Sequence, residues 1–325
     1  ISLFSLTIIS CAKKSSDDSK TTTTSSGLFV GVGDNGTILT SSDGTTWTSR
    51  TSGSSDNFSK VKYTNGLLVI RGDSGSILTS SDGISWTSRE SGSSNKLKGI
   101  SYGNGLFVIS GDSGTILTSS DNGTTWTSRT SGTSNNLRGN KFGNGLFVVT
   151  GNSGTILTSS DGTSWTSRTS GTSNNLRKII FENELFVVIG HSGTILTSSD
   201  GTTWNSRTSG TSEFLRGFTY ANSTFVISGD SGTILTSSDG TTWTERTSGT
   251  SNNLWRVNYA NSSFVTVGDN GTILTSSDGT SWTERTSGTS NNLWRVTYGN
   301  GLFVTVGQSG TILTSPDGTT WTERT

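Results

Sequence analysis

The chain is built from a short unit that recurs along almost its whole length. The stretch "TSSDGTTWT" at residues 40–48 contains Asp43, and the matching aspartate of the next copy, Asp82, follows 39 residues later. Asn122 is inserted once, which lengthens one interval to 40 residues. The recurring aspartates are Asp43, Asp82, Asp121, Asp161, Asp200, Asp239, Asp278 and Asp317. A period of this size indicates a repeat architecture, in which each unit covers its neighbours.

Each unit contains four β-type runs separated by turn signals. In one copy these runs are "LKGISY" (97–102), "LFVIS" (106–110), "TILTS" (115–119) and "TTWTSRT" (124–130). The residues between them pair Gly with Asn or Asp, as tight hairpins require where φ is positive. A four-stranded antiparallel sheet this small cannot bury both faces alone, and stacking around an axis covers them. The sequence therefore predicts an all-β, eight-bladed β-propeller of four-stranded antiparallel blades, with about 39 residues per repeat.

Composition and charge exclude several classes of protein. Only 28% of residues are hydrophobic and Met is absent, which suits Thr-rich strands better than helices. The 23 Lys and Arg balance the 23 Asp and Glu, so the electrostatic footprint of a duplex-binding protein is missing and we expect no nucleic-acid partner. With one Cys and one His, neither an internal disulfide nor a Cys/His zinc cluster can form, and we expect no metal and no cofactor.

The N-terminal segment resembles the end of a bacterial lipoprotein signal. Ile8-Ile9-Ser10-Cys11 matches a lipobox, with an aliphatic residue three positions before the Cys and a small residue just before it. The resemblance implies a signal remnant at 1–10, a lipidated Cys11 and a polar tether over 11–26. It also implies an extracytoplasmic location in the cell envelope, at the outer membrane or cell surface, with the lipid as the only membrane attachment. A disordered apolar tail is the alternative.

The propeller is expected to occupy 27–325, and its first blade lacks an obvious inner strand. The first unit begins at Gly27 with its second strand. The Thr-rich segment 19–24 falls opposite the first strand of other units, although it lacks their apolar anchors. Either 19–24 completes blade one, or that blade has three strands, or further chain follows residue 325.

The repeated turn resembles the Asp box, or BNR repeat, of the sialidase-like superfamily. Ser41-Ser42-Asp43-Gly44-Thr45-Thr46-Trp47 fits that pattern, and the run "VGDNGTIL" at 32–39 resembles the BNR-like photosystem II assembly factors. The tryptophans that close the boxes are Trp47, Trp86, Trp126, Trp165, Trp204, Trp243, Trp282 and Trp321. An Asp entering a Gly turn can accept hydrogen bonds from the next backbone N–H groups, and Trp brings a large apolar surface to the gap between blades. We therefore predict a structural role for the boxes.

A glycoside hydrolase of sialidase type is the enzymatic alternative. It would need a Tyr nucleophile. All five tyrosines occupy one repeat position, which Phe142 and Phe181 fill in other copies. The remaining acids are mostly periodic and recur in the second hairpin, where His191 replaces one of them, as expected of a solvated turn position. No G-x-S-x-G, Walker or H-E-x-x-H motif is present. We expect no catalytic residue and a protein that is not an enzyme.

Departures from the repeat mark the candidate binding site. In the first strand, the position after the leading apolar residue carries cations in four copies and Trp in the last two, where the cation moves one place along. The candidates are Lys98, Arg138, Arg177, Arg216, Trp255, Arg256, Trp294 and Arg295. At the mouth of a central channel they could hold an acidic peptide loop or an anionic glycan through charge-assisted hydrogen bonds and stacking. Inter-blade ion pairs are the alternative interpretation. The sequence thus favours a binding scaffold that presents its loops to an envelope protein or glycan.

Overall fold

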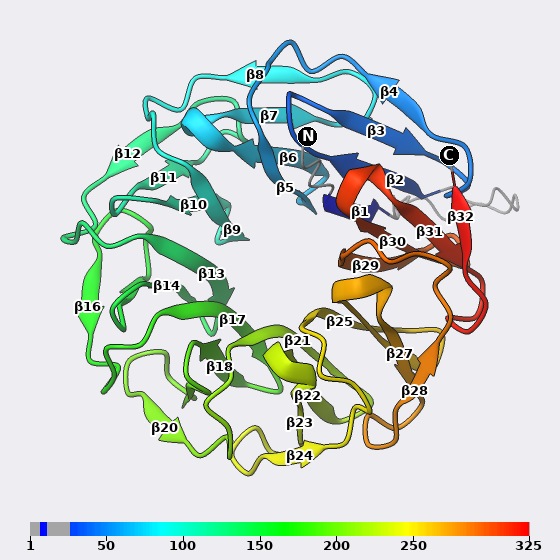
Figure 1. The fold of residues 1–325 in the computed structure, drawn as a ribbon. Helices are drawn as coiled ribbons and strands as arrows, with labels where there is room; N and C mark the ends of the chain where they lie inside the picture. Colours follow the sequence, from blue (N-terminus) through cyan, green and yellow to red (C-terminus); the bar gives the residue numbers. More distant parts are fainter. Residues whose placement is uncertain (1–6, 12–26, 325) are drawn as a thin grey trace, which may run out of the picture.

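Eight four-stranded antiparallel sheets stand around a common axis in a computed structural model, which describes residues 7–11 and 27–324 (Figure 1). Blades one to four are β1 (Thr7–Cys11), β2 (Leu28–Val32), β3 (Ile38–Ser41), β4 (Thr48–Arg50); β5 (Phe58–Thr64), β6 (Leu67–Gly72), β7 (Ile77–Ser80), β8 (Thr87–Arg89); β9 (Leu97–Gly103), β10 (Leu106–Gly111), β11 (Ile116–Ser119), β12 (Thr127–Arg129); and β13 (Leu137–Gly143), β14 (Leu146–Gly151), β15 (Ile156–Ser159), β16 (Thr166–Arg168). Blades five to eight are β17 (Leu176–Glu182), β18 (Leu185–Gly190), β19 (Ile195–Ser198), β20 (Asn205–Arg207); β21 (Leu215–Ala221), β22 (Thr224–Gly229), β23 (Ile234–Ser237), β24 (Thr244–Arg246); β25 (Leu254–Ala260), β26 (Ser263–Gly268), β27 (Ile273–Ser276), β28 (Thr283–Arg285); and β29 (Leu293–Gly299), β30 (Leu302–Gly307), β31 (Ile312–Ser315), β32 (Thr322–Arg324). The predicted eight-bladed fold is confirmed.

The first strand of each blade lies innermost and the fourth lies at the rim (Figure 1). Single 3-10 turns occupy the second hairpin of four blades: η1 (Asp73–Gly75), η2 (Asp230–Gly232), η3 (Asp269–Gly271) and η4 (Gln308–Gly310). These hairpins pack closely on the chain that leads to the next blade. A side chain at Gly114, where φ is +69°, would come within 1.9 Å of the Thr133 carbonyl oxygen, so only glycine fits there.

Blade one obtains its inner strand from a segment that the sequence analysis did not expect. β1 pairs antiparallel with β2, and the register places Thr7 opposite Val32 and Cys11 opposite Leu28. The apolar run before Cys11 thus supplies the apolar residues that 19–24 lacks. Segment 19–24 itself lies outside the described residues.

The hydrophobic core lies between neighbouring blades. Phe107 of blade three is fully buried in one cluster with Leu67 and Val69 of blade two, and the Trp126 ring packs against that cluster. Similar clusters join the other blades, and the one around Phe29 and Val304 joins blade eight to blade one. Asn300 adds polar contacts at this closure, because its side-chain amide hydrogen-bonds Gly27 at both backbone groups, at 2.9 and 2.6 Å. The ring is therefore closed by packing and by hydrogen bonds.

The Asp boxes fasten the turn between the third and fourth strands of every blade. In blade five, Asp200 Oδ1 accepts hydrogen bonds from the backbone N–H groups of Thr202 and Thr203, both at 2.8 Å. Trp204 Nε1 donates to the Gly201 carbonyl at 3.1 Å, and its ring lies 6.3 Å from that of Phe186. The hydrogen bonds from Thr203 and Thr202 hold the pKa of the Asp200 carboxyl well below its usual range. The box carboxylate is thus engaged by its own turn.

Candidate functional site in the central channel

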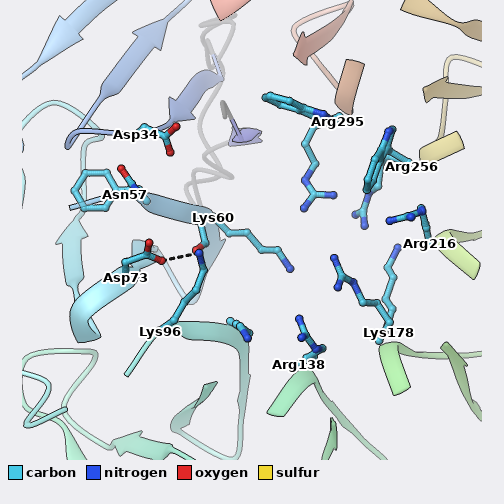
Figure 2. A pocket seen from close by; sticks show the side chains of 16 residues that line it. Asp34, Asn57, Lys60, Asp73, Lys96, Arg138, Lys178, Arg216, Arg256 and Arg295 are labelled. Carbon is cyan, nitrogen blue, oxygen red and sulfur yellow. Dashed lines mark ion pairs between the residues drawn. The ribbon is translucent and has the colours of Figure 1, made fainter. Parts of the chain in front are cut away.

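The inner strands enclose a cavity of about 470 Å³ on the axis of the propeller, opening on the face that carries the second hairpins (Figure 2). The eight candidate residues predicted from the sequence all line it, although they come from six different blades. The described lining residues include nine Lys or Arg and two Asp. A chain of zero net charge therefore concentrates positive charge at its centre.

Some of the predicted cations are neutralised within their own blade. Arg216 on β21 donates from Nε and Nη2 to the two carboxylate oxygens of Asp230, with Nη2 2.8 Å from Oδ2. Lys98 on β9 forms the equivalent ion pair with Asp112. Each acid stands in the second hairpin, 14 residues after its cation. Two of the predicted cations thus form ion pairs, but within one blade and not between blades as the alternative interpretation expected.

The two intervening blades have no acid at this hairpin position. Arg138 on β13 meets Asn152 instead, and its Nε donates to the amide oxygen at 2.9 Å. The residue 14 positions after Arg177 on β17 is His191. Burial lowers the pKa of His191, and the nearby charges of Arg177, Arg138 and Arg216 lower it further. Burial, followed by the charges of Arg138 and Arg216, lowers the pKa of Arg177 to about 10, so the Arg177 guanidinium stays protonated at neutral pH. Neighbouring blades thus present two cations without a partner carboxylate among the described residues.

The hairpin acids have a role that the sequence analysis missed. They were expected at a solvated turn position, because Asn152, His191 and Gln308 replace them in other copies. Instead, in blades three and six the hairpin acid neutralises the first-strand cation of the same blade. In blade seven the first-strand residue is neutral, and Asp269 accepts a hydrogen bond from Trp255 Nε1 at 2.5 Å. The constant spacing of 14 residues between the first-strand residue and the hairpin residue is the sequence signal for these contacts.

A ladder of aromatic and cationic groups stands beside Arg177. The His191 ring stacks on Phe214 with centroids 3.8 Å apart. The Arg216 guanidinium lies 4.3 Å from the Phe214 centroid and 4.0 Å from that of Trp255, so it is sandwiched between two rings. Phe214 departs from the repeat, since this position is Lys96 in blade three and Asn in five other blades, as with Asn175, whose side chain accepts from the Ser153 N–H at 3.0 Å. The substitution is visible in the sequence, but Phe214 was not among the predicted site residues.

A second level of cations lies one residue farther along the inner strands. It comprises Lys60, Lys178, Arg256 and Arg295, of which the sequence analysis named only the two arginines. Burial strongly lowers the pKa of Lys60 and Lys178, and the neighbouring cations lower it further. Lys178 Nζ donates to the Phe218 carbonyl at 2.8 Å. We call these four residues the waist, and the level of Arg138 and Arg177 the mouth.

The part of the chain that the structure describes contains neither a metal-binding cluster nor a membrane-spanning helix. Residues 7–11 and 27–324 hold no cluster of His, Cys, Asp or Glu able to bind a metal ion. Within the same ranges, no helix has the length and apolar character needed to cross a bilayer.

A family model described as photosynthesis system II assembly factor YCF48 matches residues 11–275. The chain belongs to the YCF48 family. The match confirms the resemblance based on the "VGDNGTIL" run, and it covers most of the repeats. No curated protein matches the chain.

Solved structures share the propeller fold with this YCF48-family chain at low sequence identity. YCF48 from Cyanidioschyzon merolae is 15% identical, covers 79% of this chain and 94% of its own, and superposes with a TM-score of 0.61. A structure of YCF48 bound to D1 peptide is 19% identical, with coverages of 71% and 81% and a TM-score of 0.56. The computationally designed Ika8 protein is 14% identical, with coverages of 88% and 92% and a TM-score of 0.73. At these identities the likeness shows the fold alone.

Proposed function

We propose that this chain is a non-enzymatic, protein-binding propeller that receives an acidic segment of a partner protein at the mouth of its channel. The observation that carries the proposal is the pair of neighbouring cations, Arg138 and Arg177, that lack the hairpin acid of the flanking blades. Membership of the YCF48 family supports it, as does the related YCF48 structure that contains a D1 peptide.

The chemistry of the mouth suits carboxylates next to apolar or aromatic side chains. Guanidinium groups bind carboxylates through two parallel hydrogen bonds, and these are stronger than neutral ones. The Phe214 ring lies 5.4 Å from the Arg177 guanidinium, and Trp255 and Trp294 line the same cavity. A cavity of about 470 Å³ has the size of a small-ligand pocket, so it accommodates a short segment and not a folded domain. The positive field at the axis would also accelerate the encounter with an acidic partner.

The same geometry argues against a sialidase-type hydrolase. Tyrosines at the end of the first strand pack on the core, as Tyr102 does with Phe107 at a centroid distance of 4.7 Å. The box carboxylates are held by their own turns, as described for Asp200. Neither group is placed in the axial cavity among its described lining residues. An anionic glycan stays the binding alternative, and competition by a sialylated oligosaccharide would favour it.

Attachment to the cell envelope through Cys11 is a separate proposal that rests on the lipobox alone. Cleavage before Cys11 would remove Thr7–Ser10, which form most of β1 and pair with β2. Lipidation and a complete blade one are therefore mutually exclusive states. The mass of the N-terminal peptide isolated from the producing cell distinguishes them: a diacylglyceryl group on Cys11 supports the anchor, and an intact, unmodified 7–11 segment rejects it.

The binding proposal is tested by fluorescence anisotropy with a labelled Asp- and Glu-rich peptide that carries one aromatic residue. The double variant Arg138→Gln and Arg177→Gln is expected to lose about tenfold or more in affinity, since each charge-assisted hydrogen bond contributes about 1.5–3 kcal/mol. Lys141→Gln is the matched control, because Lys141 lies on the same strand as Arg138, pairs with Glu182 and does not line the cavity. Equal affinities for the native chain and the double variant would reject the proposal.

A further inference from the structure

The waist gathers four cations at one repeat position of four different blades. Lys60, Lys178, Arg256 and Arg295 come from β5, β17, β25 and β29. Figure 2 shows Lys60 extending into the central space from one side, and Arg256 and Arg295 reaching into it from the other. Their head groups thus surround a common volume on the axis.

Nothing among the described residues neutralises this charge. The ion pairs of the described chain involve Lys96, Lys98, Lys141 and Arg216, and none of the four waist residues. The two Asp that line the cavity come from second hairpins at its mouth, and one of them, Asp73, pairs with Lys96 at 2.6 Å. The waist therefore differs from the mouth, where acids neutralise part of the charge.

Blade two adds a fifth cation behind the wall of the waist. Arg71 on β6 stands directly opposite Lys60 in the antiparallel register, and it is only 4% exposed. Its Nε donates to the Lys98 carbonyl at 3.0 Å, while its Nη1 has no hydrogen-bond partner. Like charges directly opposite one another on paired strands destabilise a sheet. A chain under selection for stability alone would not keep this pair, so the charge points to a ligand.

In three blades without a waist cation, the packing leaves no room for a side chain at this position. Gly99, Gly139 and Gly217 occupy the same repeat position in blades three, four and six. A Cβ at Gly99 would lie 2.3 Å from Ser110 Oγ, and one at Gly217 would lie 2.1 Å from Ser228 Oγ. The small hydroxyl residue on the second strand thus requires Gly on the first. Of blades two to eight, only four therefore carry a cation at the waist.

From this geometry we propose that the waist binds a free, compact, polyvalent oxyanion of the phosphate type, held by Lys60, Lys178, Arg256 and Arg295. Guanidinium groups match the oxygen geometry of such anions and ammonium groups add point charges. Inside the channel the attraction is weakly screened, because the site is shielded from bulk solvent. The waist lies one residue farther along the inner strands than the mouth, in the same cavity, and anion binding there does not rest on the proposed function.

Anion binding at the waist has two consequences that a surface charge would not show. A ligand that binds only the folded state raises the unfolding temperature in proportion to the logarithm of its concentration. Binding also draws protons onto the waist lysines, because a bound anion favours their charged form and opposes the effect of burial on their pKa. Proton uptake on binding is therefore expected between neutral and mildly alkaline pH.

The test titrates the full chain with sodium pyrophosphate by calorimetry and follows thermal unfolding, with sodium chloride of equal ionic strength as the reference. Pyrophosphate is expected to raise the unfolding temperature where chloride does not, and its Kd should be about tenfold lower than that of sulfate, because more charge is neutralised per ligand. Repeating the titration in buffers of different ionisation enthalpy should reveal proton uptake. Equal effects of all anions at equal ionic strength would overturn the proposal.

Variants connect the effect to the waist. Lys178→Met and Lys60→Met are each expected to weaken pyrophosphate binding about tenfold while raising the unfolding temperature without anion, because each removes an uncompensated cation. Lys141→Met, which removes a lysine outside the cavity, should leave the Kd within about threefold. An unchanged Kd in both waist variants would overturn the proposal. The double variant Arg138→Gln and Arg177→Gln separates the two proposals, since loss of peptide binding with retained pyrophosphate binding places the two ligands at different levels.

Discussion

Arg216 and Asp230 form a bidentate ion pair across 14 residues of one blade, whereas the residue at the same spacing from Arg177 in the preceding blade is His191. The two blades are copies of one unit, so the single exchange of Asp for His decides whether the mouth cation is neutralised. The available charge at the channel mouth is therefore set by the second hairpin and not by the inner strand alone.

His191→Asp is expected to rebuild this ion pair in blade five and to weaken binding of the acidic peptide about tenfold, because Arg177 would then be neutralised. Asp230→His is the reciprocal change, and it should strengthen binding by freeing Arg216. Calorimetric titration of both variants measures the effect. If both variants weaken binding, loss of local structure and not charge would explain the data.

Phe107→Ala tests the packing between blades. Phe107 is fully buried against residues of blade two, so its truncation should lower the free energy of unfolding by about 3–5 kcal/mol. Ile84→Thr is the control, because Ile84 is 51% exposed on a box turn where other copies have Thr. Urea unfolding of both variants gives the comparison. A cost at position 84 as large as that at position 107 would contradict a core located between the blades.

The Asp boxes predict how stability changes in acid. The backbone N–H groups of Thr203 and Thr202 and the Thr202 hydroxyl lower the pKa of Asp200 in the folded state. A folded pKa below the unfolded value stabilises the protein above about pH 4, and this contribution is lost as the pH falls through and below that value. Between about pH 6 and about pH 2, the free energy of unfolding should therefore fall less steeply for Asp200→Asn than for the native chain. Parallel curves would mean that the carboxylate is not linked to folding.

The waist lysines predict that stability also rises with pH in alkali. Burial and like charges lower the folded pKa of Lys178 well below its usual range, so between the folded and the unfolded pKa the unfolded chain binds more protons than the folded chain. The unfolding free energy should therefore rise with pH from the folded pKa up to about pH 10, the unfolded value. Lys178→Met should flatten this rise, as measured by urea unfolding in anion-free buffer. A native curve that already falls over this range would contradict a buried, uncompensated lysine.

Much of the fold and part of the site could be predicted from the sequence, for physical reasons that differ by region. Eight in-phase copies of the box specify the blade count, because every copy repeats the same strand and turn signals. The mouth residues were found because they break the repeat at an inner-strand position. Lys60 and Lys178 were not predicted because the same position is glycine in three copies, so the cations form no regular pattern there, and Phe214 was not predicted because it lies outside the strand.

The inner strand of blade one shows the limit of local pattern. Thr7–Cys11 reads as a signal peptide end, since a short apolar run before a Cys fits a lipobox as well as a buried strand. Only the register with β2 identifies it as the missing strand, and that pairing spans a connection much longer than the other first hairpins. Periodicity cannot detect a strand such as β1, because residues 12–26 separate it in the sequence from the rest of its unit.

The most direct measurement of the central claim is a crystal structure of the chain with the acidic peptide that binds it. Peptide carboxylates are expected within about 3 Å of the Arg138 and Arg177 guanidiniums, at the mouth of the axial cavity. A peptide seated on the rim, or against the carboxylates of the Asp boxes, would contradict it.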